Sequence, residues 1–218
     1  MRQIAVIGLS TFGLALVHAL ARQRCRVLAV DLDEYKINGV RELADEAVIA
    51  DARDPRALEA LRLQDYDAVV LSLGEPLDAS LLAALHLRDL KVRNIVAKAA
   101  SEDHRRLLQH LGVQEVIFPE ADMAQRTART LSSPGFLDTL SLGEDITIVE
   151  VSPPHEIVGR TLAELGLRKK YGVVVVALRD MLRDELRVNP DPYTPIADSD
   201  ALVVLGKDED IDRFARLP

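Results

Sequence analysis

Short apolar segments alternate with helical segments through the first 118 residues, and this alternation constrains the fold more than any other feature of the sequence. The expected strands are 4–7, 27–30, 47–50, 68–71, 95–97 and 115–118, and the expected helices are 11–23, 33–43, 55–61, 78–90 and 102–111. The strands lack alternating polar residues, which is typical of strands covered on both faces. Such βαβ units build a parallel sheet with helices on both sides, so the sequence predicts an α/β fold.

A second, smaller domain is expected after this region. One more helical segment, 120–131, leads to Ser132-Ser133-Pro134-Gly135, which interrupts the regular pattern. Expected strands at 147–151, 173–178 and 201–205 and an expected helix at 161–169 follow. We therefore predict a first domain at 1–132, a linker at 133–143 and an α+β domain at 144–218. A domain of ~75 residues is small for an independent core, so we expect it to dimerise.

Charge and composition exclude several classes of protein. The 218 residues carry 27 Lys and Arg against 35 Asp and Glu, a net charge of −8, which argues against a nucleic-acid partner. No segment approaches the roughly 18 apolar residues that span a membrane, and we see no signal peptide before the first strand. Cys25 is the single cysteine, which excludes a disulfide framework. We expect a cytosolic protein without dedicated metal chemistry.

The strongest motif runs from Gly8 to Gly13, between the first strand and the first helix. This is the context of a dinucleotide-binding fingerprint, in which Gly8 makes the tight turn and Gly13 lets the helix pack closely. Free N–H groups of Leu9, Ser10, Thr11 and Phe12 at the helix start would hold a phosphate. Ser10 stands where the usual motif has its middle glycine: its hydroxyl can donate to phosphate, but its Cβ crowds the closest approach. The alternative is a plain strand-to-helix turn.

An acidic residue, Asp31, closes the second strand, where a carboxylate can accept both ribose hydroxyls of an adenosine. A carboxylate there repels a 2′-phosphate, so the expected ligands are NAD(H), ATP or ADP. Leu32 follows it, and Asp33 is better explained as a helix cap.

Further candidates follow the other strands, because ligands of open parallel sheets lie at the carboxyl ends. They are Asp51, Ala52, Ser72, Leu73, Gly74 and Lys98. From the residues alone, Lys98 is equally well a surface lysine, and Glu120 is better explained as an acid at a helix start. No Tyr-x-x-x-Lys pair for hydride chemistry occurs in the sequence. A nucleotide pocket without catalytic residues indicates a sensor.

The order and spacing of these motifs resemble the RCK family, the KtrA- and TrkA-like regulatory subunits of bacterial potassium uptake systems. The motifs that carry the resemblance are Ile7-Gly8-Leu9, Phe12-Gly13, Val30-Asp31, 50–52, 96–99, Phe118-Pro119-Glu120, Asp122-Met123, Gly159, 165–172, 190–192 and 200–206.

The resemblance implies a Rossmann-like RCK_N domain followed by an RCK_C domain. It also implies homodimers that assemble into an octameric ring beneath a membrane potassium channel or transporter subunit of the KtrB or TrkH type. The implied adenine nucleotide site comprises Gly8, Gly13, Asp31, Asp51, Ala52, Ser72, Lys98 and Glu120. Glu120 would lie near Mg²⁺ or another cation at the nucleotide phosphates of paired subunits.

Two departures from the family pattern bear on the ligand. Ser10 and Thr11 stand where the family usually has glycine and arginine, so a charge-assisted phosphate donor is missing and the choice among ATP, ADP and NAD(H) stays open. The resemblance further implies a cyclic di-AMP site in the second domain, with Arg168 beside Leu162 and Leu167; the alternative for Arg168 is a cation near a helix C-terminus.

The leading hypothesis is a nucleotide-sensing gating subunit. Two alternatives remain: a small NAD-dependent oxidoreductase, which would share the fold, and a soluble nucleotide or redox sensor whose partner is not a channel.

Overall fold

The computed structural model describes residues 1–74, 77–132, 135–143 and 145–217. These residues form two compact units, Met1–Pro119 and Glu120–Pro218, and each is treated by itself. Among the described residues, no helix has the length and apolar character needed to cross a membrane.

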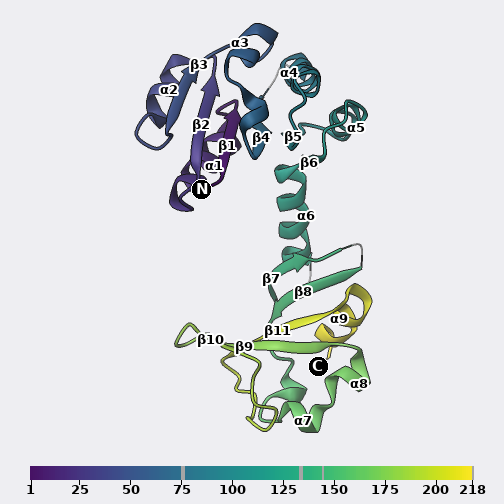
Figure 1. The fold of residues 1–218 in the computed structure, drawn as a ribbon. Coiled ribbons are helices and arrows are strands. Elements are labelled where there is room, and N and C mark those ends of the chain that lie inside the picture. The colour runs from purple at the N-terminus through teal and green to yellow at the C-terminus, as the bar shows by residue number, and fades with distance from the viewer. Residues whose placement is uncertain (75–76, 133–134, 144, 218) are drawn as a thin grey trace. The chain divides into compact units, whose positions relative to one another are not determined.

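The first unit contains a six-stranded parallel sheet in the order β3-β2-β1-β4-β5-β6 (Figure 1). Its strands are β1 Gln3–Ile7, β2 Arg26–Asp31, β3 Glu46–Ile49, β4 Ala68–Leu71, β5 Ile95–Lys98 and β6 Glu115–Ile117. This order is that of a doubly wound Rossmann fold, and it reverses direction between β1 and β4. The predicted Rossmann-like sheet is confirmed.

Five helices connect these strands: α1 Thr11–Arg22, α2 Glu34–Val40, α3 Pro55–Ala60, α4 Leu77–Asp89 and α5 Glu102–His110, with a short 3₁₀ turn at Leu63–Asp65. Asp33 caps α2 by accepting the Tyr35 N–H at 2.8 Å, as the sequence predicted. Asp54 caps α3 through the Arg56 N–H at 2.9 Å, and Pro55 follows in the first turn. Both caps satisfy backbone donors that a helix start leaves without partners.

Consecutive residues of the central strands are buried, which explains the absence of polar alternation. Ala5, Val6 and Ile7 are each fully enclosed, and their side chains enter different apolar clusters on the two faces of the sheet. Each large aliphatic side chain buried in this way contributes about 1.5–3 kcal/mol to folding.

The second unit joins the helix α6 Pro119–Ser132 to a five-stranded antiparallel sheet in the order β10-β9-β11-β8-β7 (Figure 1). The strands are β7 Phe136–Ser141, β8 Ile146–Val151, β9 Val174–Asp180, β10 Glu185–Val188 and β11 Asp200–Lys207. The other helices of this unit are α7 Leu162–Leu165, α8 Leu167–Tyr171 and α9 Asp208–Ala215, and a 3₁₀ turn covers His155–Ile157. Ile211 and Phe214 of α9 are fully buried in the core of this unit. The predicted smaller α+β domain is confirmed.

The division of the chain differs from the one expected from the sequence. The units divide after Pro119, the first residue of α6, whereas the sequence placed the limit after that helix. Arg126 of α6 donates to Asp138 at 2.6 Å, and Arg129 pairs with Asp208 at 2.8 Å, so the helix is bound to the second sheet. Within the expected linker 133–143, Phe136–Ser141 forms β7, paired with β8. Ser133, Pro134 and Glu144 lie outside the described residues.

Three further elements differ from the prediction. The expected helix 161–169 is two helices, because Gly166 adopts a left-handed conformation with φ +57°. The strand β10 was not predicted, since its alternation of charged and apolar residues spans only four positions, all of which are exposed. The helix α9 was missed as well, although Ile211 and Phe214 have helical spacing.

A buried histidine links two helices of the first unit. His104 of α5 is 1% exposed, and its Nδ1 accepts the Ala100 N–H at 3.2 Å. A neutral imidazole that accepts at Nδ1 carries its proton on Nε2, which lies 2.8 Å from Ser80 Oγ of α4. The Ser80 hydroxyl in turn donates to the Leu77 carbonyl at 2.8 Å. Burial lowers the pKa of His104 below 6.5, because it disfavours the charged form.

We expect this histidine to destabilise the protein as the pH falls. Because its folded-state pKa lies below the unfolded value, its contribution is complete above pH 6.5 and is lost as the pH falls through the folded-state pKa. Urea unfolding at about pH 7.5 and about pH 5.5 measures the effect, and His104→Gln should reduce the difference. An equally steep pH dependence in the variant would contradict this assignment.

Two fragments test where the second unit begins. We expect 120–218 to unfold at a higher temperature than 144–218, because the shorter fragment lacks β7 and the 4%-exposed Phe136. In the longer fragment Phe136→Ala should lower the free energy of unfolding by about 3 kcal/mol, whereas Leu137→Ala, on the same strand but 43% exposed, should change it little. Equal stability of the two fragments would favour the boundary expected from the sequence.

Candidate functional site

A crevice of about 180 Å³ lies at the carboxyl ends of β1, β2 and β3. It is lined by Ile7, Val30, Asp31, Leu32, Ala50, Asp51, Ala52, Arg53, Leu73 and Ala79. Five of the predicted site residues, from three separate stretches of sequence, therefore come together here: Asp31, Leu32, Asp51, Ala52 and Leu73. Most of the lining is apolar, and carboxylates stand at two of the strand ends, which suits a ligand with an aromatic base and a sugar.

The turn after β1 depends on two glycines. Gly8 has φ +93°, which favours glycine, and its N–H donates to the Val30 carbonyl at 2.7 Å. A Cβ on Gly8 would lie 2.5 Å from the Ser72 carbonyl oxygen, and a Cβ on Gly13 would collide with the Gly8 carbonyl oxygen. The absence of both side chains lets α1 begin directly against β1 and β4.

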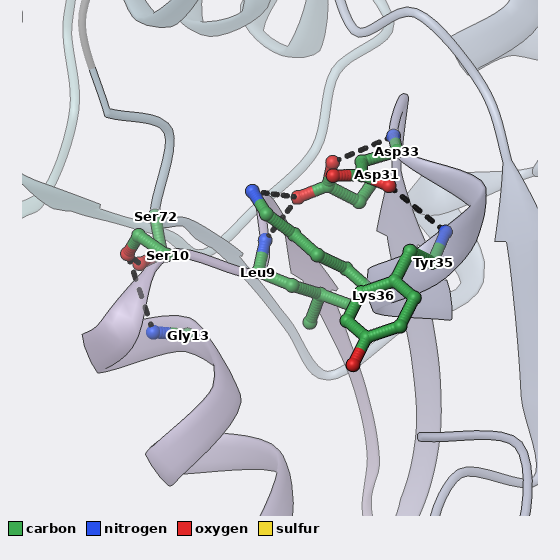
Figure 2. Close-up of polar contacts among 8 residues, drawn as sticks. All are labelled: Leu9, Ser10, Gly13, Asp31, Asp33, Tyr35, Lys36 and Ser72. Carbon is green, nitrogen blue, oxygen red and sulfur yellow. Dashed lines mark hydrogen bonds and ion pairs between the residues drawn. The ribbon is translucent and has the colours of Figure 1, made fainter. Parts of the chain in front are cut away.

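The carboxylate of Asp31 is held in one orientation by its neighbours. Its Oδ2 accepts the Leu9 N–H at 2.6 Å, and its Oδ1 accepts the Asp33 N–H at 2.9 Å (Figure 2). The Lys36 ammonium of α2 lies 3.4 Å from Oδ2. The Asp31 side chain is 10% exposed, so the carboxylate is partly shielded yet still lines the crevice. Lys36 was not predicted, because only the turn between β2 and α2 brings it back to Asp31.

A second fixed carboxylate belongs to Asp51, which follows β3. The Arg53 guanidinium binds it through Nη2 to Oδ2 at 2.7 Å and Nε to Oδ1 at 3.0 Å, and the Arg53 N–H also donates to Oδ1 at 2.9 Å. These hydrogen bonds from Arg53 lower the pKa of Asp51, so the carboxylate stays ionised. Sequence reasoning missed Arg53; the Asp-x-Arg spacing after a strand was the available signal.

A hydroxyl pair joins the start of α1 to the end of β4. Ser10 Oγ lies 2.6 Å from Ser72 Oγ, and it also accepts the Gly13 N–H at the long distance of 3.5 Å (Figure 2). Ser72 is fully buried, whereas Ser10 is partly exposed. Both residues were predicted for the site, but their mutual contact was not.

The remaining predicted residues are not among those that line the crevice. Thr11 is exposed at the start of α1, Phe12 is half-buried, and Gly74 is exposed after β4. Lys98 ends β5 and is half-buried. Glu120 is an exposed residue of α6 in the second unit, and its role at a cation stays a prediction. Among the residues that the structure describes, no group of three or more His, Cys, Asp or Glu side chains is arranged to hold a metal.

A separate hollow of about 280 Å³ lies in the second unit. It is lined by Leu162, Gly166, Leu167, Arg168, Lys169, Val173, Val174 and Val175. The three residues predicted for a second ligand, Leu162, Leu167 and Arg168, all lie here. The hollow combines an apolar floor with two exposed cationic side chains.

Comparison with known protein families establishes the family of this chain. Residues 4–119 match the TrkA-N domain, and residues 146–218 match the TrkA-C domain. The chain belongs to the TrkA-N/TrkA-C family. The resemblance to RCK proteins that the motifs indicated is thereby confirmed.

Relatives of this TrkA-N/TrkA-C protein include potassium uptake proteins. It is 37% identical over 215 residues to Ktr system potassium uptake protein C of Bacillus subtilis, covering 99% of this chain and 96% of the relative. It is 32% identical over 205 residues to Ktr system potassium uptake protein A of Vibrio alginolyticus, covering 94% of this chain and 92% of the relative.

Solved structures share the fold. The GsuK RCK domain matches with a TM-score of 0.70 at 18% identity, and the GsuK channel bound to NAD matches with a TM-score of 0.71 at 18% identity. All of this TrkA-N/TrkA-C chain is covered, but it spans only 48% and 40% of those chains.

The two glycine positions give a test of the turn. Gly13→Ala should lower the free energy of unfolding by about 2 kcal/mol or more, because the new Cβ meets backbone that cannot move freely. Gly39→Ala is the matched control: Gly39 lies within α2 with open space around it, so alanine should stabilise the helix by up to about 1 kcal/mol. Chemical denaturation measures both. A neutral Gly13→Ala would show that α1 does not need this close approach.

Proposed function

We propose that this chain is a nucleotide-sensing regulatory subunit of a potassium transport system. It binds an adenine nucleotide, either ATP, ADP or NAD(H), in the crevice of the first unit, and it controls a membrane potassium channel or transporter subunit. The observation that carries the proposal is the orientation of Asp31 at the end of β2, in a chain closely related to potassium uptake proteins.

The chemistry of the crevice supports an adenosine ligand. A carboxylate whose oxygens are fixed by two backbone N–H groups still has lone pairs for two ribose hydroxyls. The apolar side chain of Leu73, which is partly exposed, offers contact to a base. Asp51, held by Arg53, is an acceptor for an exocyclic amino group such as that of adenine. The phosphates would extend towards the start of α1, where the helix dipole favours negative charge.

Control of a partner requires that the ligand bind one state of an assembly better than the other. We propose that the chain forms homodimers that assemble into an octameric ring, and that the ring lies at the cytoplasmic side of the membrane through a KtrB- or TrkH-like partner. Shifting a two-state ring from mostly closed to mostly open needs about 5.5 kcal/mol of differential binding, which several sites can share. A cation such as Mg²⁺, bound near Glu120, is proposed to assist at the nucleotide phosphates.

The hollow of the second unit supports a second ligand of the cyclic di-AMP type. Arg168 and Lys169 place two cations beside an apolar floor that includes Leu162 and Leu167. Phosphates flanked by aromatic bases have the chemistry that such a surface recognises. This second ligand would give the same subunit a further input.

Asp31→Ala should weaken binding of ATP, ADP and NADH by about tenfold or more, because it removes charged hydrogen bonds to the ribose. Asp45→Ala is the control: Asp45 also accepts a backbone N–H, from Val27 at 2.8 Å, but at the amino end of β2, the opposite edge of the sheet. Isothermal titration calorimetry measures the affinities. Equal affinities in wild type and Asp31→Ala would remove Asp31 from the site.

The same two variants extend the test to the potassium system. In cells without other potassium uptake, co-expression with a Ktr-type membrane subunit should support uptake for wild type and Asp45→Ala, and nucleotide-responsive uptake should be lost for Asp31→Ala. Copurification with a partner that is not an ion-transport protein would favour the soluble-sensor alternative. Hydride transfer to small carbonyl compounds by the purified protein would favour the oxidoreductase.

A further inference from the structure

The Ser10–Ser72 hydroxyl pair spans the point at which the strand order reverses. Ser10 stands at the start of α1, directly after β1, and Ser72 directly follows β4. Their oxygens are 2.6 Å apart, which is a short hydrogen bond (Figure 2). In open α/β sheets this reversal point is where a dinucleotide passes from one half of the sheet to the other. The Ser10–Ser72 contact, which closes this passage, therefore affects which nucleotides can bind.

The direction of this hydrogen bond follows from burial. Ser72 is fully buried, so leaving its hydroxyl proton without an acceptor would cost free energy. Ser10 Oγ is the acceptor at hand, and we assign Ser72 as the donor. The proton of the Ser10 hydroxyl is then left for another acceptor. Its capping bond to Gly13 N–H does not use that proton, because there Ser10 Oγ is itself the acceptor.

The side chain of Ser10 also occupies space. The usual fingerprint has glycine here so that the backbone can approach a diphosphate closely. Because Gly8 and Gly13 have no side chains, the loop packs closely against Ser72. A Cβ added at either glycine would come into short contact with Ser72 atoms. A serine Cβ, fixed by the bond to Ser72, therefore stands in the passage between the β1 and β4 ends.

The crevice is lined mainly by the ends of β1, β2 and β3, and neither serine is among its lining residues. Those strands form one half of the sheet, which holds one nucleoside of a dinucleotide. A mononucleotide needs only this half, and its terminal phosphate can stop at the start of α1. A dinucleotide must continue past the hydroxyl pair.

We propose that Ser10, positioned by Ser72, donates to the phosphate of an adenosine mononucleotide and disfavours dinucleotides, so that the crevice selects ADP or ATP over NAD(H). The inference rests on the proposed nucleotide function and narrows its ligand class. Ser10 contacts the ligand, and Ser72 acts through Ser10 as a positioning residue.

Calorimetry with adenosine, ADP and NADH on the full chain tests this. Ser10→Ala should weaken the binding of ADP by about tenfold, as expected for a lost hydrogen bond to a charged group, and leave the affinity for adenosine unchanged. Ser72→Ala should weaken the binding of ADP by about threefold, because the Ser10 hydroxyl loses its orientation, and it should leave the affinity for adenosine unchanged. Ser10→Gly should raise the affinity for NADH relative to ADP by about fivefold or more, because it opens the passage.

The control is Ser101→Ala, since Ser101 also caps a helix of this unit, by accepting the His104 N–H at 3.2 Å, and lies outside the crevice lining. It should change stability without changing any ratio of affinities. Equal loss of adenosine and ADP in Ser10→Ala, or an unchanged NADH-to-ADP ratio in Ser10→Gly, would overturn the inference while leaving the nucleotide function intact. A wild type that binds NADH more tightly than ADP would overturn the inference alone. If the wild type binds none of adenosine, ADP and NADH, the proposed function fails, and the inference fails with it.

Discussion

The hydrogen bond from the Leu9 N–H to the Asp31 carboxylate, 2.6 Å long, is the contact on which the site depends. It ties the loop after β1 to the end of β2, so the proposed phosphate-binding loop and the proposed ribose-binding acid are fixed relative to each other. The bond is possible because Gly8 turns the chain with φ +93° and itself donates to the Val30 carbonyl. Without that turn, Asp31 would lose the backbone donor that orients its carboxylate at the crevice.

The two units of the chain differ in the chemistry of their sites. The first has a parallel sheet whose strand ends converge on a crevice with two oriented carboxylates, Asp31 and Asp51. The second has an antiparallel sheet, a cationic apolar hollow, and the helix α6 bound through Arg126 and Arg129. These features suit the proposed detection of ligands, in which a ligand acts by binding one state of an assembly better than another.

The hydroxyl pair of Ser10 and Ser72 explains how a departure from the usual fingerprint can be compatible with a nucleotide site. A serine in place of a glycine costs space at the diphosphate but supplies an oriented donor. The same substitution therefore favours the binding of mononucleotides, which end at this point, and disfavours the binding of dinucleotides, which must pass it. The ligand preference of the crevice would then follow from one side chain and its buried partner.

The strand-helix alternation of the first unit, the glycine turn, the caps Asp33 and Asp54 and the family could all be predicted from the amino-acid sequence, because each depends on residues close together in the chain. It placed Asp31, Asp51 and Leu73 at strand ends, and the parallel topology then brought them to one crevice. The three-dimensional structure was needed to show that α6 groups with the second unit, that 136–141 pairs as a strand, and that Ser10 contacts Ser72. Edge-strand pairing and contacts between side chains far apart in the sequence leave little pattern in the local sequence, since they depend on where the chain returns in space. Lys36 and Arg53 lie near Asp31 and Asp51 in the sequence, but only the structure shows that their side chains bind those carboxylates.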